Sequence, residues 1–351
     1  MSDKKITFSV IENEDNAIPE PIEKSVSGKD YLFYGEDNLY PELLFGCYDN
    51  CTMLQSIING LSDYIAGSGI TEDFDVTSKG DKCSELLKKV ALDYIIFGAF
   101  SIQVRRNSYG DVVALDYVDV SKIRLSEDEK TVYYCRKWSK YARDIRKYDR
   151  WDKGLKQSNS VFYYKNPKSR GVYGTPIWKA AIEDALTAIE ITHFHYSAIR
   201  NNFVPSAVVN FNNGVPTDEQ QDEIEAKLNE KFSGSSNAAR LLVSFNDNKD
   251  SAVTVERLSE DGFDSKYQAL RDSVRDNMLT AFRASGQLFG VLPEQTGFNS
   301  VEYLNAFALY KETVVKPLQQ EIEDAFKRLG YDITLNEFVV EFKDNGETTV
   351  A

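Results

Sequence analysis

Residues 286–303 read GQLFGVLPEQTGFNSVEY, and this stretch interrupts a region of strong helical periodicity. Before it, apolar positions follow the three- and four-residue steps typical of one helix face: Tyr267, Leu270, Val274, Met278 and Phe282. After it, Asn299 is placed as an N-cap with Glu302 three residues later, which predicts the start of another helix. The stretch is therefore predicted to reverse the chain between two long helices.

The loop is unusually apolar for a surface connector. Its large apolar side chains are Leu288, Phe289, Val291, Leu292 and Phe298. Its glycines are too far apart for a phosphate-binding loop and no lysine follows them, which argues against a nucleotide site. Two interpretations stay open from the residues alone: a plain connector, and a loop that packs against neighbours, including another subunit.

Residues 30–175 are predicted to form one α+β unit. Helical spacing runs from Tyr40 to Ile65, and a second helix is expected from Ser84 to about Phe97. Four β-branched or aromatic runs then predict a small antiparallel sheet: AFSIQVRR, DVVALDYVD, TVYYCRKW and SVFYYK. The polar stretch 1–29 is expected to be a flexible N-terminal arm.

Residues 176–202 predict a helix with Pro176 in its first turn. Its apolar stripe contains Trp178, Ile182, Ala185, Ile189, Tyr196 and Ile199. Residues 203–258 then predict a small α/β insert, with a helix capped by Thr217 and Gln220 and with strands in SAVVNF, ARLLVSF and AVTVERL.

The helix within residues 259–285 leads into the opening loop, and the last helix runs on to Gly330. Pro317 lies inside this last helix and is expected to bend it. A final strand at 336–342, NEFVVEF, is expected to join the first sheet.

The composition limits the possible functions. The 351-residue chain has a formal net charge of −14, which argues against a sequence-reading DNA-binding protein but is compatible with one that DNA merely passes through. No stretch approaches about 18 uninterrupted apolar residues, and the N-terminus lacks a signal-peptide core, so no membrane contact is predicted and a cytoplasm is the expected compartment. The four scattered cysteines fit reduced thiols: Cys47, Cys51, Cys83 and Cys135.

Residues that could carry catalysis are scarce. His193 and His195 point in different directions on a regular helix, and Cys47 and Cys51 have no second ligand pair nearby, so neither pair predicts a metal site. Acidic clusters in so acidic a chain are expected to be solvated: Glu36–Asp37, Asp73/Asp75 and Glu260–Asp261. Walker and G-x-S-x-G motifs are absent. We therefore expect no enzyme, catalytic residue, cofactor or metal. The alternatives are an acidic metal-dependent nuclease or other DNA-processing enzyme, or a monomeric structural adaptor.

The order of these parts resembles the portal proteins of tailed bacteriophages. The resemblance rests on the stretches 33–51 and 56–70, the segment 170–209 that begins RGVYGTP, the segment 278–299 with its apolar loop, and the segment 303–326 with its internal proline. Together they span most of residues 32–329. The resemblance implies an α+β portal fold, with residues 30–175 as the wing and 176–202 and 259–285 as stem helices. Residues 203–258 would be the clip, 286–299 the tunnel loop, and 300–351 the wing helix and C-terminal strand. A helical crown is expected to be small or absent.

The family resemblance also implies a function. The chain would be one subunit of a ring, typically a dodecamer, at one capsid vertex, through which double-stranded DNA is packaged and ejected without sequence specificity. Its expected partners are the terminase large subunit, then the head–tail adaptor, together with the major capsid and scaffold proteins. Its expected location is the virion, and the host cytoplasm during assembly.

The tunnel-loop residues implied to face DNA are Gln287, Leu288, Phe289, Val291, Leu292, Pro293, Glu294, Gln295, Thr296, Phe298 and Asn299. Because the loop carries no Lys or Arg, contacts from Gln287, Gln295 and Asn299 are expected rather than a grip on phosphate. Candidate channel residues on the stem are Lys266, Arg271 and Arg275, for which ordinary surface ion pairs are the alternative. Deletion of Leu288–Thr296 is expected to leave folding and ring formation largely intact while impairing DNA packaging or retention.

Overall fold

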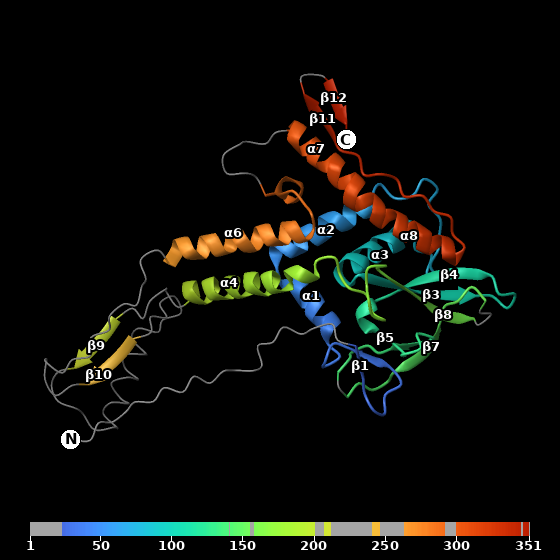
Figure 1. The fold of residues 1–351 in the computed structure, drawn as a ribbon, viewed down its shortest axis with the longest axis horizontal. Coiled ribbons are helices and arrows are strands. Elements are labelled where there is room, and N and C mark those ends of the chain that lie inside the picture. Colours follow the sequence, from blue (N-terminus) through green and yellow to red (C-terminus); the bar gives the residue numbers. More distant parts are fainter. Residues whose placement is uncertain are drawn as a thin grey trace. The chain divides into compact units, whose positions relative to one another are not determined.

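The computed structural model describes residues 23–139, 141–154, 158–200, 207–211, 241–245, 263–291, 300–344 and 347–350 (Figure 1). The chain divides into two compact units, Met1–Glu183 with Asn277–Ala351 and the inserted Asp184–Asp276. The insertion points fall close to the ends of the two predicted stem helices. The first unit therefore joins the predicted wing to the C-terminal helices.

Three helices open the first unit: α1 (Tyr40–Asn50), α2 (Thr52–Ala66) and α3 (Cys83–Phe97). The prediction of one continuous helical run from Tyr40 to Ile65 is wrong, because Cys51 has extended backbone angles of φ −104° and ψ 104°. The apolar spacing continues through this break, which is why periodicity did not reveal it. The prediction for α3 is confirmed to within one residue, and Gly98 ends the helix in a left-handed conformation at φ 67°.

A six-stranded sheet forms the other half of the unit, in the order β4-β3-β8-β7-β6-β5. Its strands are β3 (Ala99–Arg106), β4 (Val112–Val118), β5 (Ile123–Leu125), β6 (Thr131–Tyr134), β7 (Arg146–Arg150) and β8 (Asn159–Lys165). The predicted antiparallel arrangement is wrong at one place, since β7 and β8 pair in parallel. β7 (RKYDR) is almost wholly charged, and the three residues of β5 are too few for a periodic pattern to be recognised.

The segments before α1 and near the C-terminus differ in secondary structure from the prediction. Part of the predicted arm is ordered, because β1 (Glu23–Ser25) pairs with β2 (Leu32–Tyr34). The predicted strand at 336–342 is also wrong. Leu335 makes an isolated bridge to Ile70, and the strand proper, β11 (Glu341–Asp344), pairs with β12 (Glu347–Val350) instead of the first sheet.

The last helical region consists of α7 (Ser300–Tyr310), a π-helical segment (Lys311–Val315) and α8 (Lys316–Leu329). The irregularity lies immediately before Pro317, which has no N–H to donate to the preceding turn. A π-helical turn inserts an extra residue, so the helix continues past the proline.

The inserted unit contains most of α4 (Ile182–Arg200) and most of α6 (Phe263–Ala281), together with the parallel pair β9 (Ala207–Phe211) and β10 (Leu241–Phe245). The prediction that α4 starts at Pro176 is wrong by several residues. Trp178 is fully buried and its Nε1 donates to the Ile95 carbonyl at 3.0 Å, so this segment packs on α3 before the helix begins. The predicted helix after Thr217 and the strand AVTVERL lie outside the described residues.

Candidate functional site

The candidate loop begins where α6 ends, in a tight turn. Arg283 adopts a left-handed conformation at φ 54°, and the Ala284 N–H donates to the Leu279 carbonyl at 2.9 Å, which closes the helix. A 3-10 turn, η5 (Gly286–Phe289), follows directly. The Val291 N–H then donates to the Gly286 carbonyl at 2.9 Å. The first six residues of the loop, 286–291, are thus a compact backbone structure and not an open connector.

Two apolar side chains of this turn are buried in the first unit. Leu288 is 7% exposed and Phe289 is 9% exposed. The Phe289 ring lies 5.9 Å from the ring of Tyr310 on α7 and 6.1 Å from that of Tyr64 on α2, measured between centroids. The assignment of Leu288 and Phe289 to a DNA-facing surface is therefore wrong, because both anchor the loop to the body.

Tyr64 fastens the same turn through a polar contact. Its hydroxyl donates to the Leu288 carbonyl at 3.2 Å. Burial raises the pKa of Tyr64, so the group keeps its proton and remains a donor at neutral pH. Its ring also packs edge-on against Phe307 of α7, with centroids 5.2 Å apart. Tyr64 thereby joins α2, the loop and α7.

Gly60 of α2 provides the space for the Phe289 ring. A Cβ atom at this position would lie 2.8 Å from the ring carbon Cε1 of Phe289 and 2.9 Å from Cδ1. Sequence reasoning missed both Gly60 and Tyr64 as parts of the site. The available signal was a glycine in the middle of a helix, which costs about 1 kcal/mol relative to alanine and often marks a close approach.

The remaining tunnel-loop predictions divide into two groups. Gln287 and Val291 are half-buried at the base of the loop. The other predicted residues lie outside the described part of the chain: Leu292, Pro293, Glu294, Gln295, Thr296, Phe298 and Asn299. The predicted helix restart is confirmed, since α7 begins at Ser300.

The stem candidates on α6 have different surroundings. Arg271 is exposed. Arg275 forms ion pairs with Asp272 and Asp276, each with an N···O distance of 3.0 Å, so its charge is locally compensated. Lys266 belongs to α6, but its side chain is not among those that the structure describes.

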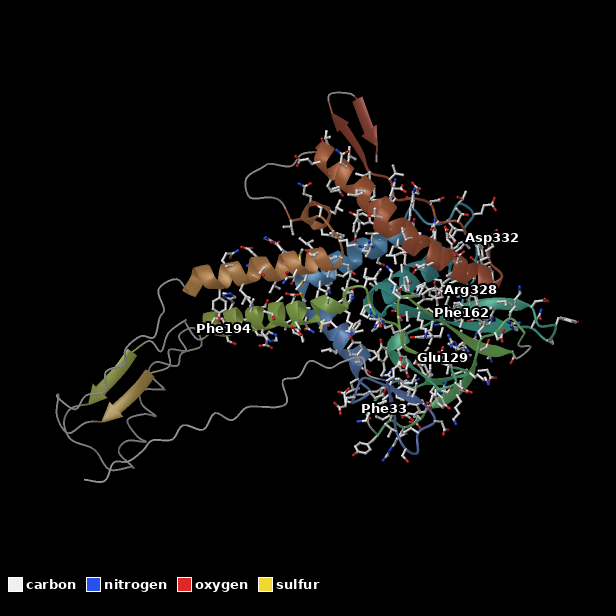
Figure 2. The ribbon with its side chains drawn as sticks, viewed as in Figure 1. Phe33, Glu129, Phe162, Phe194, Arg328 and Asp332 are labelled. Carbon is white, nitrogen blue, oxygen red and sulfur yellow. The ribbon has the colours of Figure 1, made fainter. Side chains whose placement is uncertain are left out.

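Large apolar side chains stand exposed on the helices of the inserted unit. Phe194 of α4 (Figure 2) stacks on Tyr267 of α6 with ring centroids 5.2 Å apart and planes 11° apart. Phe194 nevertheless remains 43% exposed, while Tyr196 is 64% and Leu270 44% exposed. The predicted stripe of α4 is buried at its start, where Ile182 and Ala185 are covered, and becomes exposed at Tyr196.

Buried ionisable groups in the first unit have structural roles. Arg124 is fully buried and donates to the backbone carbonyls of Asn38, Ser121 and Ile123. Asp93 accepts hydrogen bonds from the Tyr117 hydroxyl at 3.0 Å, and burial raises its pKa well above the usual value. These contacts join loops and helices to the sheet.

The cysteines, the histidines and two of the predicted acidic clusters have the following surroundings. All four cysteines are buried free thiols. His193 is exposed on α4, whereas His195 is half-buried beside Tyr267. Asp73 accepts hydrogen bonds from the backbone and side chain of Ser84, and Asp75 pairs with Lys82. Within the described ranges, no group of three or more His, Cys, Asp or Glu side chains could hold a metal ion. Each described helix is too short or too polar to cross a bilayer.

Solved structures share this fold. A chain in the virion of a native gene transfer agent particle matches with a TM-score of 0.56 and 15% identity, over 84% of this chain and 82% of that one. A chain in the neck of the native particle, computed with C12 symmetry, matches with a TM-score of 0.56 and 14% identity over the same shares, 84% and 82%. The fold is therefore one that also occurs in a chain of the neck of a gene transfer agent particle.

The sequence comparisons identify the family. The probable portal protein of Haemophilus phage HP1 (strain HP1c1) is 24% identical over 244 residues, or 69% of this chain and 68% of that protein. An uncharacterised protein of Rickettsia felis is 28% identical over 152 residues, or 43% of this chain and 37% of that protein. Residues 77–348 match the phage portal protein family, and the chain belongs to that family. Its function is that of a phage portal protein, a structural component of the capsid in the virion.

Proposed function

We propose that this chain forms a closed ring of identical subunits, a dodecamer, around a channel for double-stranded DNA. The observation that carries the proposal is the exposure of Phe194, Tyr196 and Leu270 on α4 and α6. Large exposed apolar side chains on neighbouring helices of one subunit favour burial in an interface with another copy of the chain. A head-to-tail contact between unlike faces closes into a ring when its rotation divides the circle. The C12 symmetry of the related neck supports twelve subunits.

The same proposal assigns partners to the inserted unit. Residues 203–258, as the clip, bind the terminase large subunit during packaging and the head–tail adaptor afterwards. The ring assembles with the major capsid and scaffold proteins in the host cytoplasm, and it performs no catalysis. The resemblance to portal proteins in the segments that flank the clip supports this assignment.

The channel-facing part of the loop is proposed to be residues 292–299, with Gln287 and Val291 at its base. The anchor formed by Leu288 and Phe289 supports this narrower choice, because it fixes one end of the segment to the body. Polar contacts from Gln295 and Asn299 accompany DNA passage. On the stem, Arg271 is the preferred candidate, since Arg275 is already paired with two aspartates.

Native mass measurement and negative-stain imaging of the purified chain test the ring. Rings of uniform size are expected, and a Tyr196→Glu/Leu270→Glu variant should remain monomeric with an unchanged circular dichroism spectrum. A wild-type chain that stays monomeric beside capsid and scaffold proteins would contradict the ring and favour a monomeric adaptor. Metal-stimulated DNA cleavage that is lost on a single carboxylate substitution would favour the nuclease alternative.

A second experiment tests the loop. Replacing residues 292–298 by a Gly-Ser linker of equal length should preserve unfolding temperature and ring assembly but reduce DNA packaging or retention. The matched control, Leu288→Ser/Phe289→Ser, should lower stability by several kcal/mol because it removes two buried apolar side chains. Normal packaging by the linker variant would exclude a channel role for this segment.

A further inference from the structure

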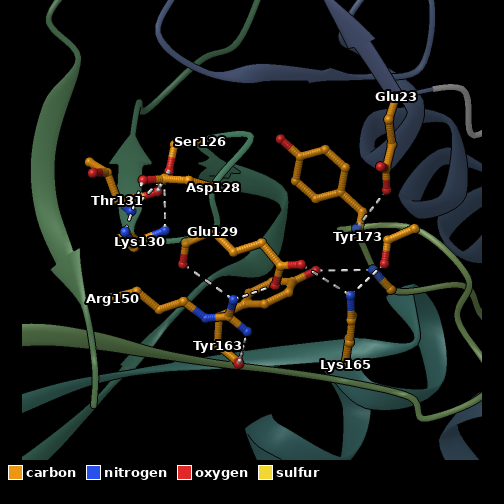
Figure 3. Close-up of polar contacts among 12 residues, drawn as sticks. Glu23, Ser126, Asp128, Glu129, Lys130, Thr131, Arg150, Tyr163, Lys165 and Tyr173 are labelled. Atoms are coloured by element: carbon orange, nitrogen blue, oxygen red, sulfur yellow. Dashed lines mark hydrogen bonds and ion pairs between the residues drawn. The ribbon is translucent and has the colours of Figure 1, made fainter.

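The loop at residues 166–175 holds a carboxylate from the start of the described chain. The Tyr173 N–H donates to Glu23 Oε1 at 2.8 Å (Figure 3). The same carboxylate lies against Gly171, where a Cβ atom would come within 2.1 Å of Glu23 Oε1. A side chain at position 171 would therefore displace the acid, and the glycine leaves room for an anion.

Side-chain contacts from the sheet fix this loop. The Lys165 ammonium donates to the Gly171 carbonyl, and the Tyr163 hydroxyl accepts from the Gly174 N–H at 3.1 Å (Figure 3). Glu129 forms ion pairs with Arg150 and with Lys165, the latter at 3.8 Å. Because these partners belong to β7, β8 and the β5–β6 turn, the anion site is built before any further ligand arrives.

Three cations line a pocket beside the seated carboxylate. The pocket has a volume of about 540 Å³, and its lining includes Lys168, Arg170 and Lys179 together with Glu23. All three cationic side chains are exposed, and none forms an ion pair with another residue in the described ranges. In a chain of net charge −14, such a local excess of positive charge is suited to an anionic partner.

The chain directly upstream of Glu23 has the complementary charge. Residues 6–22 contain Glu12, Glu14, Asp15 and Glu20 and no lysine or arginine. Three residues span at most roughly 11 Å, so the length of chain between them allows Glu20 to reach the pocket that Glu23 lines. We propose that the pocket formed by Lys168, Arg170 and Lys179 docks the acidic N-terminal segment, residues 12–22, with Glu23 as its fixed end.

This occupant is favoured over nucleic acid by three arguments. The site already binds a carboxylate of the same segment through the Tyr173 N–H. The segment is covalently held at the pocket, which gives it a high effective concentration compared with a free ligand. A duplex would also have to approach a protein of net charge −14. In this proposal, the predicted N-terminal arm binds at a defined site on the first unit.

A binding experiment tests the proposal on a chain that lacks residues 1–22 and keeps Glu23. A fluorescein-labelled peptide of residues 8–22 should bind this chain, as measured by fluorescence anisotropy, and binding should weaken as salt screens the charges. Lys168→Glu/Arg170→Glu should reduce the affinity at least about 10-fold. The control Lys79→Glu/Lys88→Glu makes the same charge change at exposed lysines outside the pocket and should leave the affinity unchanged.

A second measurement uses the full chain. All four native thiols are buried, so a spin label at Asn16→Cys reports on the arm alone. Lys168→Glu/Arg170→Glu should increase the mobility of this label, and the control pair should not. Equal peptide affinity for both charge variants, or no peptide binding at all, would overturn the proposal. Binding of a DNA duplex but not of the peptide, abolished by the same variant, would assign the pocket to nucleic acid instead.

Discussion

Gly60→Ala tests the anchor of the proposed channel loop, because the substitution has one stabilising and one destabilising effect on the free energy of unfolding. Replacing a glycine in a helix interior by alanine stabilises the helix by about 1 kcal/mol. At position 60, however, the new Cβ would lie 2.8 Å from one Phe289 ring carbon and 2.9 Å from another. Overpacking a buried ring costs about 1–3 kcal/mol. The substitution is therefore expected to lower the free energy of unfolding by about 0–2 kcal/mol.

Gly46→Ala is the matched control for this experiment. Gly46 lies inside α1, and a Cβ there would meet no atom within 4 Å. The control should gain about 1 kcal/mol, so the two variants should differ by about 1–3 kcal/mol. Thermal unfolding followed by circular dichroism resolves this difference, since 1 kcal/mol corresponds to about 2–4 °C in a domain of this size. Adding Phe289→Leu to Gly60→Ala should relieve the clash and recover part of the helix gain. If Gly60→Ala stabilises the chain as much as Gly46→Ala does, the loop is not anchored at Phe289.

Three further outcomes are expected. Tyr64→Phe removes the donor to the Leu288 carbonyl and should cost about 0.5–1.5 kcal/mol in urea unfolding, whereas Tyr48→Phe, which alters an exposed hydrogen bond to Asn59, should change little. The pKa of Asp93 is raised in the folded chain, chiefly by burial and then by Asp119, so the folded state holds its proton longer than the unfolded state. The free energy of unfolding should consequently fall as pH rises above about 4, as measured by a series of unfolding curves at different pH. Asp93→Asn should flatten this fall, and a flat profile in the wild-type chain would contradict the prediction. Burial raises the pKa of Cys47 to about 11 and that of Cys83 to about 12, so Ellman's reagent at pH 8 should react with these thiols only after denaturant is added, and rapid reaction of the native chain would refute their burial.

The fold could be predicted from sequence wherever one pattern dominates. α3 and α6 follow from apolar residues at helical spacing, and α7 follows from the N-cap pattern that ends the loop. Elements without such a pattern were missed, as the charged strand β7 shows. The late start of α4 depends on tertiary contacts, because residues 174–178 contact Gly98 and the Ile95 carbonyl. Local helix propensity does not depend on those contacts and therefore does not predict them.

The site was only partly predictable for the same reason. The sequence shows that Leu288 and Phe289 are apolar, but it does not show which element covers them. Their partners, Gly60 and Tyr64, lie more than two hundred residues upstream on α2. An apolar loop is thus equally compatible with exposure toward a channel and with burial against its own subunit.

The buried anchor and the proposed channel-facing segment of the loop are expected to affect different quantities, the anchor stability and the segment DNA transport. The burial of Leu288 and Phe289 predicts that deletion of Leu288–Thr296 destabilises the subunit, contrary to the tolerance expected from the sequence, because the deletion removes two buried side chains along with part of the proposed channel-facing segment. Substitutions at the anchor, including Gly60→Ala, act first on the free energy of unfolding. Substitutions confined to residues 292–298 leave the contacts of Phe289 with Tyr64 and Tyr310 in place. A packaging defect in a fully stable subunit therefore assigns DNA contact to the tip, whereas a defect that scales with lost stability indicates an effect through the anchor.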